Sequence, residues 1–142
     1  MEEGQAKLLF AELAATPDGW RVTLPDCAFL QRPVDLVLQT LPVPRPAVPQ
    51  PNEVMKSLAA HLVANLSTVI ARAEQAFAAH LGSDFPTYAP RIRNPHLWLY
   101  VETLEDDGPS RWTFVVEQID NPDYGTHIEF DDLLVIDVWG GD

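Results

Sequence analysis

The residues of this chain whose types and spacing could do chemistry lie near its C-terminus. His127, Glu129 and Asp131 alternate with apolar residues, and alternate residues of a β-strand point to the same face of their sheet. A histidine beside two carboxylates can bind a divalent metal ion or act as an acid–base pair. This segment is therefore the first candidate for a functional site.

Two interpretations of this segment stay open. In the first, His127 and Glu129 form the site of a metal-dependent hydrolase or a small-ligand binder, to which the nearby Asp120 or Asp123 could add oxygen ligands. In the second, the alternation is only the solvated face of an antiparallel strand. Because no cysteine or second histidine stands at ligand spacing, the sequence favours the second interpretation.

A second group of candidates is aromatic. His96, Trp98 and Tyr100 would share one face of a strand predicted near residues 97–103, with Glu102 continuing that face. Such a face either lines a binding surface or packs in an aromatic core, and the core is the commoner outcome. The candidate binding residues of the whole chain are Trp98, Tyr100, Tyr124, His127 and Glu129.

The longest regular pattern predicts a helix over residues 52–81. Asn52 is a suitable N-cap, Gly82 is a natural stop, and apolar residues recur between them at the spacing of one helical face. A straight helix of this length would span roughly 45 Å, more than short strands can cover. The excess predicts either a bend near Ser67 and Thr68 or a helical partner, and the second option makes a homodimer the expected assembly.

Alternating runs separated by turn residues predict β-strands on both sides of this helix. We expect strands at residues 8–13, 20–24 and 34–39 before it, and at 97–103, 112–119, 126–130 and 133–139 after it. Residues 41–51, which hold five prolines, are expected to form an extended connector, and residues 84–95 a loop. The prediction is one α+β domain over residues 1–142, a mostly antiparallel sheet of two meanders with one long helix packed across a face. Whether the two meanders share one sheet stays open.

The charge of the chain is concentrated in its last third. The net charge is −12, and residues 102–142 hold twelve acidic residues against Arg111 alone, which leaves −11 there. Nucleic-acid binding is disfavoured, because it needs clustered cations. The acids either attract a basic protein partner or form a solvated face that keeps the protein soluble.

The remaining features are those of a cytoplasmic protein without a catalytic motif. The single Cys27 excludes an internal disulfide and suits a reducing compartment. The acidic start of the chain is unlike a signal peptide. The sequence contains no run of about twenty apolar residues, which a membrane span would need. Because phosphate-binding and nucleophile motifs are missing, we predict no cofactor and favour a function other than catalysis.

Residues 121–130 and the ending Val138 to Asp142, together with the order of the elements, resemble small bacterial domains of unknown function. Some of those domains are suspected toxin-immunity proteins. The resemblance carries over no catalytic residue. It implies a non-enzymatic binding protein, of an immunity or regulatory kind, that meets a basic partner through its acidic C-terminal sheet.

Overall fold

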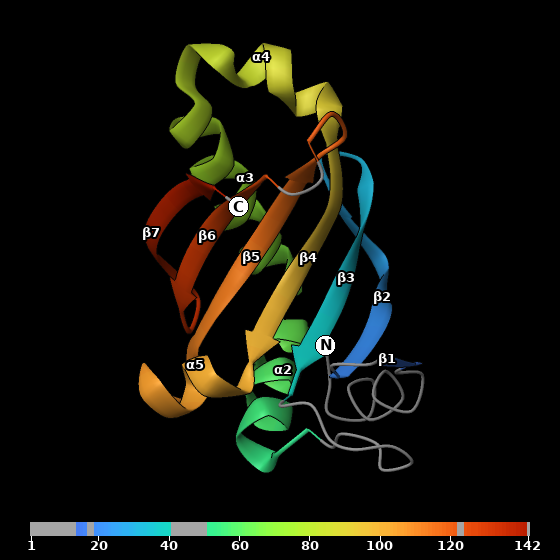
Figure 1. The fold of residues 1–142 in the computed structure, drawn as a ribbon, viewed down its shortest axis with the longest axis vertical. Coiled ribbons are helices and arrows are strands. Elements are labelled where there is room, and N and C mark those ends of the chain that lie inside the picture. Colours follow the sequence, from blue (N-terminus) through green and yellow to red (C-terminus); the bar gives the residue numbers. More distant parts are fainter. Residues whose placement is uncertain (1–13, 17–18, 41–50, 122–123, 142) are drawn as a thin grey trace.

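One β-sheet and the helices packed on one of its faces make up the fold (Figure 1). The computed structural model describes residues 14–16, 19–40, 51–121 and 124–141. In the view of Figure 1 the two longest helices lie behind the sheet. We call the face toward the viewer the open face.

The two predicted meanders share a single sheet. Among the described residues, seven strands follow one another across it in sequence order. Neighbouring strands are antiparallel, except that β3 and β4 run parallel, with Leu36 opposite Leu97 and Leu38 opposite Leu99. A parallel pair needs a long crossover between its strands, and the helical segment supplies it. The strands are β1 Ala14–Thr16, β2 Gly19–Phe29, β3 Arg32–Gln39, β4 Ile92–Tyr100, β5 Arg111–Gln118, β6 Gly125–Asp131 and β7 Leu134–Gly141.

The predicted helical segment is helical but bent. It consists of α2 (Glu53–Ala64) and α3 (Leu66–Leu81), and the helical stretches on either side of the break are bent by 84°. The cap prediction is confirmed, because the Met55 backbone N–H donates to the Asn52 side chain at 2.8 Å. At the break, the Asn65 side-chain amide donates to the His61 carbonyl at 2.9 Å and so caps the end of α2. The bend therefore lies at Asn65, two residues before the predicted position.

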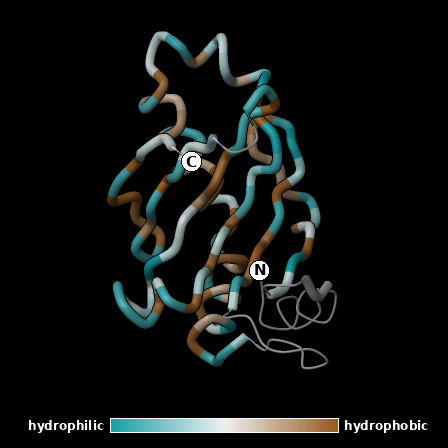
Figure 2. The backbone as a smooth tube through the Cα atoms, in the orientation of Figure 1, coloured by the Kyte–Doolittle hydropathy of each residue, from teal (hydrophilic) through white to brown (hydrophobic). Residues whose placement is uncertain are grey.

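The core lies between the helices and the sheet. Phe29 packs against Phe77 of α3 with ring centroids 5.7 Å apart, and against Phe114 of β5 at 5.0 Å. Polar and apolar residues interchange along the strands (Figure 2), as expected for a sheet with one buried face. Most of the large apolar residues of both helical rows are buried within the chain, including Val63 and Ile70 of the second row, whereas Leu66 is partly exposed and Ala64 and Ala71 are exposed. Little of the large apolar surface on which the homodimer prediction rested is therefore left uncovered.

Two local predictions are wrong. Residues 84–91, expected as loop, form the helical turns η1 (Gly82–Asp84), α4 (Phe85–Tyr88) and η2 (Ala89–Arg91), and β4 already begins at Ile92. The strand predicted to reach residue 103 ends at Tyr100, where α5 (Val101–Asp106) begins. In α5, Val101 and Leu104 are buried three residues apart, a helical spacing that two residues are too few to reveal in sequence.

Some predictions fall largely outside the described residues. They are the strand at 8–13 and the proline-rich connector at 41–51, of which only position 51 is described. The α+β class, with a mostly antiparallel sheet, is confirmed.

Among the described residues, no single helix is long and apolar enough to cross a membrane. The stretches Glu53–Ala64 and Leu66–Arg91 reach that length and composition only as a pair, across the bend.

We expect the substitution Asn52→Ala to lower the free energy of unfolding by about 1 kcal/mol, because the first turn of α2 loses its cap. Urea denaturation measures the change. Asn52→Asp keeps an oxygen acceptor and should stay close to the wild-type protein. Equal losses for both variants would show that the side-chain cap contributes nothing.

Candidate functional site

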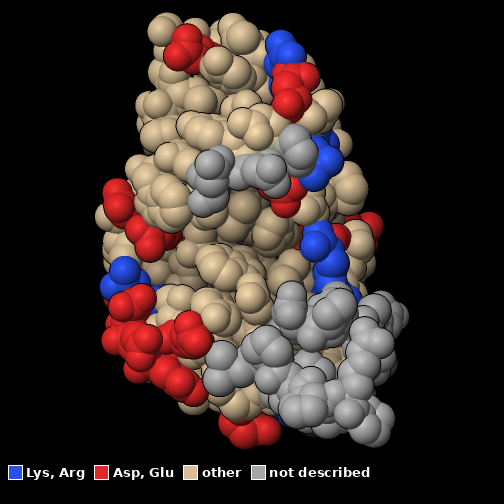
Figure 3. Space-filling view, viewed as in Figure 1, with Lys and Arg blue, Asp and Glu red and all other residues tan. Residues whose placement is uncertain are grey.

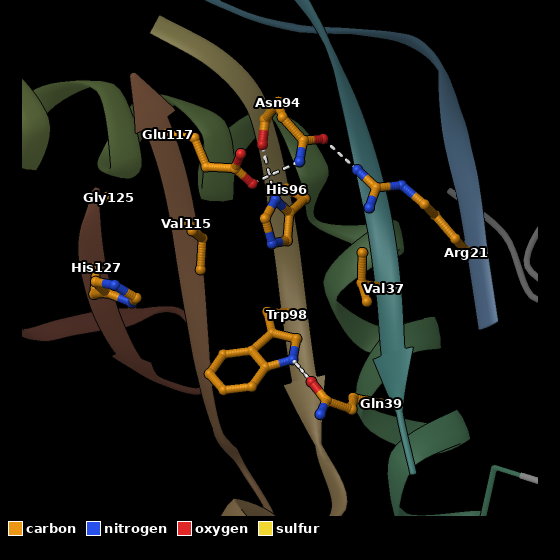
Figure 4. A pocket seen from close by; sticks show the side chains of 10 residues that line it. All are labelled: Arg21, Val37, Gln39, Asn94, His96, Trp98, Val115, Glu117, Gly125 and His127. Carbon is orange, nitrogen blue, oxygen red and sulfur yellow. Dashed lines mark hydrogen bonds between the residues drawn. The ribbon is translucent and has the colours of Figure 1, made fainter. Parts of the chain in front are cut away.

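The open face of the sheet is hollowed by a pocket of about 350 Å³. Side chains of β2 to β6 line it, with Asn94 and His96 at its floor (Figure 4). The central surface of this face is mostly uncharged (Figure 3). The complete lining is Arg21, Val37, Gln39, Asn94, His96, Trp98, Val115, Glu117, Gly125 and His127.

Strand register places these residues in rows across the sheet. His96 of β4 is opposite Val115 of β5, which in turn is opposite His127 of β6. In the next row, Trp98 stands between Val37 of β3 and Thr113 of β5. Because alternate residues point to one face, the leucines between them pack on the helices, and these side chains reach the open face.

A chain of paired polar groups runs across strands β2 to β5 and includes Asn94. Arg21 donates to Asp35 at 2.5 Å and also to the side-chain oxygen of Asn94. The Asn94 amide donates to Glu117 at 2.7 Å, and Arg93 pairs with Glu117 at 3.1 Å. Two cations thus face two carboxylates across four strands, so the charge of this network is balanced within the protein.

An irregularity in β4 brings Asn94 into this network. The register of β4 with β5 shifts between Arg93 and His96, and Asn94 has a positive φ of 52°. Asparagine adopts this left-handed region more readily than most residues, and such bulges redirect side chains. The bulge turns the Asn94 carbonyl toward the His96 ring, which bonds to it at 2.8 Å.

His96 is held neutral with one ring nitrogen available. Its side chain is only 9% exposed, and this burial lowers the pKa of His96 below the ordinary value. Since a carbonyl only accepts, Nδ1 carries the proton donated to Asn94. Nε2 is then an acceptor, and no described residue donates to it. Figure 4 shows it turned away from Asn94 toward the middle of the pocket.

Trp98 forms the apolar wall. Its indole N–H donates to the Gln39 side-chain oxygen at 2.6 Å, and its ring stacks against Tyr100 with centroids 5.4 Å apart. Figure 4 shows a face of the indole turned outward. Thr113, its neighbour on β5, is buried. The indole is therefore fixed at its edge and presents a flat apolar surface.

His127 closes the pocket on the β6 side. Its ring stacks on Trp139 of β7 with centroids 4.0 Å apart. Burial lowers the pKa of His127, while the nearby Glu129 carboxylate and a hydrogen bond to Gly141 act in the opposite direction. Both pocket histidines thus favour the neutral form.

The structure divides the predicted binding residues. Trp98 and His127 line the pocket, and Tyr100 and Glu129 occupy neighbouring positions on the open face. Tyr124 instead packs over Gly140, where an added Cβ would collide with its hydroxyl. The predicted continuation of the aromatic face by Glu102 is wrong, because Glu102 belongs to α5. It still reaches Tyr100, and a hydrogen bond between them raises the pKa of the Tyr100 hydroxyl.

The metal interpretation gains no support from the described geometry. No group of three or more His, Cys, Asp or Glu side chains within the described part of the chain is placed to hold a metal ion. The Asp131 carboxylate accepts from the Ser110 hydroxyl at 2.5 Å, and Asp120 pairs with Arg91. Asp123 lies outside the described residues.

Four polar residues of the pocket were not predicted from the sequence: Arg21, Gln39, Asn94 and Glu117. They come from four strands, and Arg21 and Asn94 are 73 residues apart. The Asn94-Pro95 pair was the one local signal, because proline removes a backbone donor from the strand.

A second surface lies at one end and edge of the sheet. Exposed carboxylates gather on α5 and at the turn between β6 and β7 (Figure 3, lower left). The Ser110 hydroxyl donates to the Asp131 carboxylate, and the Asp132 backbone N–H donates to the Ser110 carbonyl, so that turn is tied to the chain leaving α5. We call this surface the acidic end. It consists of Glu102, Glu105, Asp106, Asp107, Asp131 and Asp132.

Comparison with family models, with curated proteins and with solved structures found no match to this chain. The resemblance to small bacterial immunity domains therefore stays an expectation.

We expect the protein to lose stability as the pH falls below about 6.5, partly through His96. Because the folded-state pKa of His96 is lowered, the unfolded chain binds more protons between that pKa and 6.5, so unfolding becomes easier as the pH falls through this window. Denaturation of wild type and His96→Gln from pH 7.5 to 5 measures it, and the variant should show the shallower dependence. The control, His80→Gln, changes an exposed histidine of α3 and should keep the wild-type slope. Identical slopes in all three proteins would contradict the assignment.

Proposed function

We propose that this protein is a non-enzymatic binding protein, of an immunity or regulatory kind, that binds a basic protein partner. The observation that carries the proposal is the placement of the acidic end beside an exposed apolar edge strand. Charge complementarity of this sort speeds association and makes it sensitive to salt.

The acidic end has little compensating charge of its own. All six of its carboxylate residues are exposed. Arg111 is the only Lys or Arg between residue 102 and the end of the chain. Asp132 pairs with His61 at 2.7 Å, and among the described residues no other carboxylate of the acidic end forms an ion pair. A cationic surface would supply the missing charge.

The edge strand β7 adds apolar contacts next to these acids. It pairs only with β6 in the described sheet, and three of its large side chains are exposed: Leu134 by 64%, Ile136 by 46% and Trp139 by 41%. Edge strands with exposed apolar residues are common sites of association, and tryptophan is a frequent anchor at interfaces. A partner that covered β7 and the acidic end would gain both kinds of contact.

The homodimer stays a prediction, but the surface expected to form its interface changes from the helices to the edge strand β7. Because most of the large apolar residues of the helices are buried within one chain, the exposed apolar strand β7 is the surface that a second copy would use, through strands related by a two-fold axis. Each copy carries the same net charge of −12, so two copies repel one another. Charge therefore favours a basic partner over a second copy.

We place this binding protein in the cytoplasm. Burial, with the Glu74 charge in support, raises the pKa of the half-buried Cys27 thiol to about 11. A thiol with so high a pKa reacts slowly and stays reduced in that compartment.

Small-ligand binding is the second candidate function, and the pocket on the open face is the observation that favours it.

We expect wild-type protein to retain a basic partner from lysate of its source at low salt and to release it as salt rises. The variant Glu102→Gln, Glu105→Gln, Asp106→Asn should lower the affinity for that partner about tenfold. The matched control, Asp26→Asn, Asp84→Asn, Asp120→Asn, removes the same charge at exposed positions outside the acidic end and should bind normally. Isothermal titration with the purified partner measures each affinity.

Three results would contradict this proposal. They are no partner at either salt concentration, a partner without excess positive charge, and equal losses in both charge variants. Light scattering distinguishes self-association, since one chain has a mass of 15.8 kDa.

A further inference from the structure

We propose that the pocket on the open face binds a neutral polyhydroxylated ring, the chemistry of a sugar or cyclitol unit. This inference does not depend on the basic partner. It rests on the size of the pocket, its balanced charge, the unpartnered nitrogen of His96 and the exposed face of Trp98.

The pocket has the size and position of a small-ligand site. Its volume of about 350 Å³ is at the lower end of the range for such sites, which combine apolar surface with a few convergent polar groups. Val37, Val115 and Trp98 supply the apolar surface, and amide, imidazole and charged side chains surround it. A single ring with its substituents fits this space.

The charge of the lining favours a neutral ligand. Arg21 is already bonded to Asp35 and Asn94, and Glu117 to Asn94 and Arg93. An anion would have to compete with Asp35 for Arg21, and a cation with Arg93 for Glu117. Breaking a partly buried pair leaves an uncompensated charge. A neutral ligand leaves the network intact.

His96 offers a hydrogen-bond acceptor to a ligand. Its Nε2 is unprotonated and has no partner among the described residues, although the residue as a whole is only 9% exposed. Among the described residues no fully buried side-chain nitrogen or oxygen lacks a partner, so this nitrogen is open to the pocket. A ligand can therefore place an N–H or O–H against it.

The other polar groups require both acceptors and donors. The Gln39 oxygen accepts from Trp98, so the Gln39 amide group keeps its own donors. The Glu117 carboxylate keeps lone pairs beyond those used by Arg93 and Asn94. A hydroxyl both donates and accepts hydrogen bonds. A ring with several hydroxyls therefore suits this lining better than a group that only donates or only accepts.

Trp98 supplies the surface for the ring itself. Its edge is fixed by Gln39 and its position by stacking on Tyr100, while one ring face is turned outward (Figure 4). The C–H groups of a sugar ring are apolar, and an indole face is a broad apolar surface that carries negative charge density. The ring can therefore lie on Trp98 while its hydroxyls reach His96 and Gln39.

The test follows the indole N–H signal of Trp98 in nitrogen-15 NMR spectra, assigned with the variant Trp98→Phe. Full-length protein is titrated with glucose, galactose, mannose, N-acetylglucosamine and myo-inositol, each up to about 50 mM. We expect at least one of them to shift this signal saturably. Cyclohexanol, a ring of similar size with one hydroxyl, and inorganic phosphate should leave it unchanged. A disaccharide of the best monosaccharide distinguishes a glycan unit, which should bind more tightly, from a free sugar.

Variants connect the binding to the proposed groups. Gln39→Leu and His96→Phe should each weaken binding about tenfold, with thermal melting used to confirm folding. Val54→Ala, at an exposed position of α2 outside the pocket, is the control and should bind as the wild type does. The inference is overturned if no probe saturates, if cyclohexanol shifts the signal equally, or if phosphate binds in preference. Unchanged affinity in a folded Gln39→Leu variant would also overturn it.

Discussion

The parallel pairing of β3 with β4 is the constraint on which the rest of this structure depends. It joins two meanders that would otherwise each leave an edge exposed, and it aligns Leu36 and Leu38 with Leu97 and Leu99 over the helices. Parallel strands cannot be joined by a tight turn, so the chain between them must cross a face of the sheet. The bend at Asn65 lets α2 and α3 both pack on that face. The helices thus have two roles: they connect the parallel strands β3 and β4, and they cover the core.

The same pairing creates the pocket. Arg21, Val37 and Gln39 come from the first meander, and the remaining lining residues come from the second. The register that buries the leucines on one face brings His96 beside Asp35 and Trp98 beside Val37 on the other. The hydrogen bond between Arg21 and Asn94 then crosses β3. Neither meander alone contains this site, so its integrity depends on the packing of the helices behind it.

The pocket and the acidic end differ in their charge balance. In the pocket network, cations and carboxylates are paired within the protein. Along α5 and the turn between β6 and β7, carboxylates project into solvent with little compensation. A balanced network holds side chains in fixed positions without favouring a charged ligand, whereas an unbalanced cluster acts at a distance and is weakened by salt. The pocket residue His127 stacks on Trp139 of the edge strand β7.

The sequence by itself determined the elements whose causes are local. The Asn52 cap lies within four consecutive residues, and the alternation of β5 and β6 follows from the geometry of an extended chain. These features needed no knowledge of the fold. Helix α5 escaped detection because two buried residues in six carry too little periodicity. The pocket was decided only by tertiary structure, because register between strands far apart in sequence sets which polar groups meet. Arg21 and Asn94 become hydrogen-bond partners through that register. The bulge directs the Asn94 side chain, but the neighbouring strands determine which groups it meets.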